Sequence, residues 1–168
     1  ESDARDATAL RLALHREGLN GLRCEVHTRE GDRLPYRPYL FNLIVADSAS
    51  RVQAAELLRV LRPCGGVLLA DSADSLSKAA DGITGETFKP SLETSCRFGF
   101  RRGLLSGSGA WTHGYGDLGN TACSNDRTKF GPMDILWFGR PGTQFMLDRH
   151  IKGTSPLVDK GLLYVTGN

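Results

Sequence analysis

Apolar positions in the first part of the chain follow two different periods. In residues 6–16 they recur at helical spacing, with arginines and acids on the other side, which predicts an amphipathic helix ending near Gly18. Residues 22–28 alternate apolar and polar positions and predict a short strand. The near-continuous apolar run at residues 40–46 predicts a strand that is covered on both faces.

A second helix is predicted at residues 50–61, where apolar residues follow the i, i+3, i+4, i+7 spacing. Pro63 cannot continue this helix, and the two glycines that follow allow a sharp return into the apolar strand "VLLA". Helix and strand therefore alternate, which predicts an α/β fold with parallel strands and crossover helices. A short helix is expected at residues 72–82, and one more strand at residues 95–103.

The character of the chain changes after these elements. Glycine, proline and aromatic residues dominate in short strand-like pieces such as "DILWFG" and "GLLYVTG", and no helical periodicity is present from residue 107 onward. We therefore expect an α/β domain at residues 1–102, a Gly/Ser-rich linker at residues 103–110, and an all-β segment at residues 111–168.

Composition excludes several classes of partner. The formal charge is +2, with 21 basic and 19 acidic residues interspersed, so nothing predicts nucleic-acid binding. No apolar stretch approaches the roughly 18 to 20 residues of a membrane span. No targeting signal is readable at the start, which leaves both the cytoplasm and export open. The four cysteines lack metal-ligand spacing, so we expect reduced thiols and no metal, although one pair could bridge in an exported protein.

The phrase "LRPCGG" at residues 61–66 resembles a family motif. In class I S-adenosylmethionine-dependent methyltransferases of the type 11-like group, "LRPGG" joins the helix after the fourth strand to the fifth strand, and this chain matches it with one inserted cysteine. The resemblance implies an incomplete Rossmann-like methyltransferase sheet, S-adenosylmethionine as cofactor and a methyltransferase activity. The methyl acceptor, a small molecule or a protein, is not identified.

The resemblance also implies candidate cofactor ligands. The family places an acid four residues before the leucine of an "LPF/LPY" phrase, where it meets the adenine amino group. Glu30 stands four residues before Leu34 and is the residue carried over, together with its neighbour Gly31, while Asp32 is a weaker substitute.

Acids near two other strand ends complete this candidate site. Glu1 falls about where the family has the acid that binds the ribose hydroxyls, with Asp3 as the neighbouring candidate. Asp47 follows the apolar run at the place of a residue that faces cofactor or substrate. The usual "FD" before that strand is "FN" here, at Phe41 and Asn42, and no catalytic base is implied.

The glycine-rich turn of the family is missing from the sequence. No GxGxG leads from a strand into a helix, and the family's strand order 3-2-1-4-5 would leave a gap at the centre of the sheet. We therefore expect the N-terminal strands to lie in a longer protein, and the present stretch to be inactive by itself.

The second part resembles the opening of a pyrroloquinoline-quinone-like β-propeller, through "WTHGYGDLGNT", "WFG" and "DRH". Such a propeller would be truncated here, and we do not expect bound quinone, because no quinone-contact or metal-ligand pattern is visible. We interpret His113 and Asp117 as turn residues, and the cluster Arg97, Arg101 and Arg102 as the solvated face of an edge strand. A non-catalytic scaffold whose propeller acts as a binding module is the alternative function.

Overall fold

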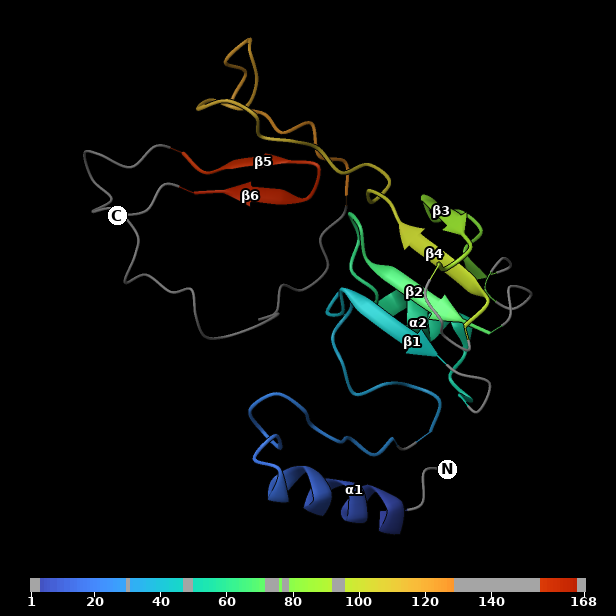
Figure 1. Ribbon diagram of the computed structural model, residues 1–168. Coiled ribbons are helices and arrows are strands. Elements are labelled where there is room, and N and C mark those ends of the chain that lie inside the picture. Colours follow the sequence, from blue (N-terminus) through green and yellow to red (C-terminus); the bar gives the residue numbers. More distant parts are fainter. Residues whose placement is uncertain are drawn as a thin grey trace.

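The computed structural model describes residues 4–29, 31–46, 50–71, 76, 79–91, 96–128 and 155–165. Its regular elements lie in two groups along the chain (Figure 1). In chain order they are α1 (Ala4–Arg16), β1 (Leu43–Ala46), α2 (Ala54–Val60), β2 (Val67–Ala70), β3 (Gly85–Phe88), β4 (Phe98–Arg102), β5 (Leu157–Asp159) and β6 (Leu162–Tyr164).

Strands β1 to β4 form one mixed sheet in the order β1-β2-β4-β3. β1 and β2 are parallel, with Leu43 opposite Val67 and Ala46 opposite Ala70. β4 is antiparallel to both of its neighbours, β2 and β3. β5 and β6 form a separate antiparallel hairpin.

The predicted fold class, a Rossmann-like methyltransferase sheet of parallel strands with crossover helices, is wrong. The described residues contain mostly strands, only two short helices, and a sheet with just one parallel pair. Connection lengths give the physical reason. A parallel return needs a crossover of a dozen or more residues, usually a helix, and residues 89–97 between β3 and β4 are too few for one.

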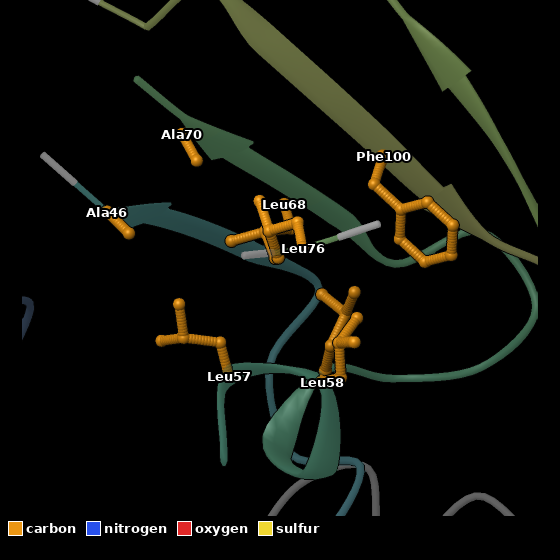
Figure 2. Packing of buried hydrophobic residues seen from close by; sticks show 8 residues of the cluster. Ala46, Leu57, Leu58, Leu68, Ala70, Leu76 and Phe100 are labelled. Atoms are coloured by element: carbon orange, nitrogen blue, oxygen red, sulfur yellow. The ribbon is translucent and has the colours of Figure 1, made fainter. Parts of the chain in front are cut away.

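The hydrophobic core lies between α2 and one face of the sheet (Figure 2). Leu57, Leu58 and Leu61 come from consecutive turns at the end of the helix and are buried because their spacing puts them on one side. They meet Leu68 of β2 and Phe100 of β4. The helix predicted at residues 50–61 is therefore confirmed from Ala54 to Val60.

The corner at residues 61–66 also forms as predicted. Cys64 and Gly65 both have left-handed backbone angles, with φ of 60° and 106°, which turn the chain sharply after Pro63. The corner is tied to the end of β4, because the Cys64 N–H donates to the Gly103 carbonyl at 2.8 Å and the Gly65 N–H donates to the Arg102 carbonyl at 2.8 Å.

Other predictions for the first part have mixed outcomes. The helix at residues 6–16 is confirmed by α1, which lies apart from the four-stranded sheet in Figure 1. Residues 22–28 form turns and irregular chain rather than a strand. The strand at residues 40–46 forms as β1, but it is not covered on both faces, because Leu43 is 57% exposed and Val45 is 61% exposed.

The second part is described at residues 111–128 and 155–165, and its predicted strand at "GLLYVTG" is confirmed by β6. The predicted piece "DILWFG" lies outside the described residues, as does most of the helix expected at residues 72–82. No helix among the described residues is both long enough and apolar enough to cross a membrane.

Candidate functional site

Most of the predicted cofactor ligands lie outside the described residues. These are Glu1, Asp3, Glu30 and Asp47. Gly31 is described, and it is an exposed turn residue with φ of 69° and open space around its Cα. Only one of these five residues is described, so their assignment as ligands stays a prediction.

The carboxyl ends of β1 and β2 form the best-defined candidate site. These strands are parallel, and Ala46 is opposite Ala70, so both strands end at the same edge of the sheet. In open sheets with parallel strands, ligands bind at this edge. An acid follows each strand directly in the sequence, Asp47 after β1 and Asp71 after β2.

Asp71 is the described member of this site, and one of its carboxylate oxygens is unsatisfied. Oδ1 is buried and has no hydrogen-bond partner among the described residues. The main-chain carbonyl of the preceding residue, Ala70, does have a donor, because the Arg97 N–H donates to it at 3.0 Å. A buried carboxylate oxygen without a donor is costly, so a hydroxyl or amine brought by a ligand would stabilise it.

A charged pair on α2 holds the "LPY" segment that follows Gly31. Glu56 Oε1 accepts the Leu34 N–H at 2.7 Å, and Arg59 Nη2 donates to the Leu34 carbonyl at 3.2 Å. The two side chains also form a bidentate pair, with Arg59 Nε to Glu56 Oε2 at 2.7 Å and Arg59 Nη2 to Oε1 at 2.6 Å. The hydrogen bond from Arg59 lowers the pKa of Glu56 to about 2, with further lowering from the Leu34 N–H.

Arg102 has a structural role that the sequence did not indicate. Its side chain is buried rather than solvated, and β4 lies between β2 and β3 rather than at an edge, so the interpretation of the arginine cluster is wrong for Arg102. Arg97 and Arg101 are exposed, as expected. Arg102 Nη1 donates to the Leu58 carbonyl at 2.5 Å and to the Leu61 carbonyl at 2.8 Å, and the guanidinium lies over the Tyr39 ring at 4.8 Å. A positive charge at the C-terminal end of α2 satisfies carbonyls that the helix leaves free.

The second part of the chain has a separate hollow of about 450 Å³. It lies between the turn at residues 112–114 and the β5–β6 hairpin, and its lining is mostly apolar, with Leu157, Tyr164 and Val165 contributing. His113 borders it, and its Nδ1 lies 2.9 Å from Thr112 Oγ1.

Asp117 follows residues 112–114 of this hollow closely in the sequence, and its side chain stabilises a turn. Its carboxylate accepts hydrogen bonds from the Thr121 hydroxyl at 2.8 Å, from the Thr121 N–H at 3.2 Å and from the Gly119 N–H at 2.9 Å. These bonds, the Thr121 hydroxyl first, lower the pKa of Asp117. Within the described ranges, no three His, Cys, Asp or Glu side chains are grouped so that they could hold a metal ion.

Comparison of the chain with protein-family models, with curated proteins and with solved structures found no match. Sequence reasoning missed Asp71, although a signal for it was present: "LIVAD" and "VLLAD" are both apolar strands followed by an acid, and only the first acid was selected.

Proposed function

We propose that the chain contributes to the cofactor site of an S-adenosylmethionine-dependent methyltransferase, at the carboxyl ends of β1 and β2. The observation that carries the proposal is the buried Oδ1 of Asp71 at that edge, which has no hydrogen-bond partner within the described part of the chain. The match of residues 61–66 to the methyltransferase motif supports the choice of cofactor. The proposal requires only the parallel β1–β2 pair, so it does not depend on the parallel sheet that the sequence wrongly predicted.

The chemistry asks little of the protein beyond binding and orientation. S-adenosylmethionine, when bound, supplies an electrophilic methyl group on a cationic sulfur, together with hydroxyl and amine donors. Asp71 would accept a hydrogen bond from one of these donors and would favour the positive charge. The Glu56–Arg59 pair would hold the segment that begins at Gly31 in one position, through its contacts with Leu34. Methyl transfer needs no covalent protein intermediate, so orientation is the main contribution expected from these residues.

Isothermal titration calorimetry of the full-length protein with S-adenosylmethionine tests the proposal. We expect saturable binding, and we expect Asp71→Asn to weaken it about tenfold, the loss of roughly one charge-assisted hydrogen bond. Asp81→Asn is the matched control, because Asp81 is an exposed acid of the same charge outside the edge. No heat at near-millimolar cofactor, or equal affinities for the two variants, would reject the assignment.

The hollow beside the hairpin favours a second candidate, a binding module without catalysis. Its mostly apolar lining suits an apolar or aromatic small molecule. The fluorescent probe 8-anilinonaphthalene-1-sulfonate would then bind, and Tyr164→Ser would reduce its signal. Tyr115→Ser is the control, because Tyr115 is exposed but does not line the hollow. Equal signals from both variants would reject this candidate.

A further inference from the structure

Within the described part of the chain, one edge of strand β1 has no strand paired to it. The Val67 N–H donates to the Asn42 carbonyl at 2.8 Å, and Leu43 is in register with Val67. In a parallel ladder this pattern directs the main-chain groups of alternate residues toward β2, so those of Leu43 and Val45 point away from it. No hydrogen bond joins these outward groups to any other described residue, and both side chains are more than half exposed.

The two edges of the sheet differ in how they are protected. β3, at the far edge, carries Glu86 and is followed by Lys89 and Pro90. Charges and proline are the usual devices that prevent an edge strand from pairing with another chain. β1 has no charged residue and no proline within its four residues, Leu43–Ala46. Of the two edges of the sheet that the described residues form, β1 is therefore the one open to a further strand.

We propose that β1 pairs with β1 of a second copy of this chain, antiparallel about a two-fold axis at Ile44. This register puts Leu43 of each copy opposite Val45 of the other. Both are outward-pointing residues, so each such pair exchanges both of its main-chain hydrogen bonds. The pairing is thus complementary to itself, as a two-fold interface must be.

The side chains of β1 also favour pairing with a second copy of the strand. Leu43 and Val45 lie on the same face of the strand, since side chains alternate, and their cross-strand contact removes apolar surface from water. The strand is uncharged, so the antiparallel copy brings no like charges together. Because Glu86 and the residues after it block the β3 edge, the assembly closes at two copies rather than growing into a fibre.

The β5–β6 hairpin offers a competing edge, and its geometry makes it weaker. Leu163 of β6 is 65% exposed. Lys160 and Gly161 have φ of 48° and 77°, typical of a two-residue hairpin turn, which makes Asp159 and Leu162 a hydrogen-bonded pair. Within β6, only Leu163 then directs its main chain outward, whereas β1 offers two such residues.

Light scattering coupled to size-exclusion chromatography, over micromolar to near-millimolar protein, tests the proposal. We expect a concentration-dependent dimer, and we expect Val45→Lys to raise its dissociation constant at least about tenfold. Leu163→Lys and Leu118→Lys are matched controls at exposed leucines, and both should dimerise as the parent does. Leu43→Lys is a second β1 variant in case Val45→Lys unfolds, which circular dichroism would reveal.

Each other outcome contradicts a definite part of the inference. A parent chain that stays monomeric overturns it, and so does a dimer that Leu163→Lys dissociates while Val45→Lys does not. Particles that grow beyond two copies overturn the closed two-fold pair. Hydrogen exchange gives an independent measure, because the amides of Leu43 and Val45 should become protected as the dimer forms. None of these results depends on cofactor binding.

Discussion

Replacing Glu56 with glutamine should destabilise the protein by removing the charge from the pair that fastens α2 to Leu34. The pKa of Glu56 falls from its ordinary 4.5 to about 2 in the folded protein, mainly through the hydrogen bond from Arg59. At about 1.4 kcal/mol per pH unit, this difference corresponds to an upper bound of about 3.5 kcal/mol. Glutamine keeps one acceptor and solvent screens part of the charge, so we expect a loss of about 1–2 kcal/mol at pH 7.

The pH dependence of this loss distinguishes a charge effect from a packing effect. Because the folded pKa is lower than the unfolded one, the contribution of Glu56 is fully present above about pH 5 and is lost as the pH falls toward 2. The difference in unfolding free energy between the parent and Glu56→Gln should therefore be largest at neutral pH. By pH 3 it should have fallen to roughly half, since the unfolded chain is then mostly protonated.

Urea unfolding followed by circular dichroism at pH 7 and pH 3 measures both values. Glu86→Gln is the matched control, because Glu86 pairs with Arg101 at 3.0 Å but is 66% exposed, against 13% for Glu56. Exposed pairs contribute little, so the control should lose less than about 0.5 kcal/mol. Equal losses for the two variants, or a loss for Glu56→Gln that does not change with pH, would refute the reasoning.

Two further predictions concern the packing of the corner at residues 61–66. Arg102→Met should lower the unfolding free energy by about 2–4 kcal/mol in urea titrations, because the Leu58 and Leu61 carbonyls lose a buried charged donor, and Arg102→Lys should recover part of it. Gly161→Ala should lower the melting temperature, because Gly161 has a positive φ and an added Cβ would collide with the Cys64 side chain. Adding Cys64→Gly should relieve the collision and restore part of the melting temperature. A double variant that melts no higher than Gly161→Ala alone would contradict this contact.

Local patterns in the sequence predicted local elements well. Helical spacing placed α1 and α2, and the proline and glycines after α2 placed the corner and β2, because these signals depend on neighbours in the chain. Strand direction depends instead on where a connection leads. β4 was predicted as one more strand without its antiparallel direction, and β3 was missed, since "GETF" has one glycine and one acid in four residues.

The same limit explains the candidate site. The family resemblance suggested Asp47, and a strand followed by an acid is a local signal that could also have suggested Asp71. The burial of Arg102 could not be read locally, because its partners, Leu58 and Leu61, are more than forty positions away in the sequence. An arginine in a run of charges is usually solvated, and only the packing of β4 against α2 makes this one internal.

The corner and the candidate site lie at opposite ends of β2, which separates stability from binding. Arg102 and Gly65 fasten the amino end of β2 to β4, whereas Asp71 leaves its carboxyl end. At about 3.3 Å per residue, the four residues of the strand put roughly 13 Å between the two ends. Variants at the corner should therefore lower the melting temperature without changing the affinity of the folded protein for a ligand at Asp71. A tenfold change in affinity in Arg102→Lys, measured where that variant is still folded, would show that the two ends are coupled and that the corner is part of the site.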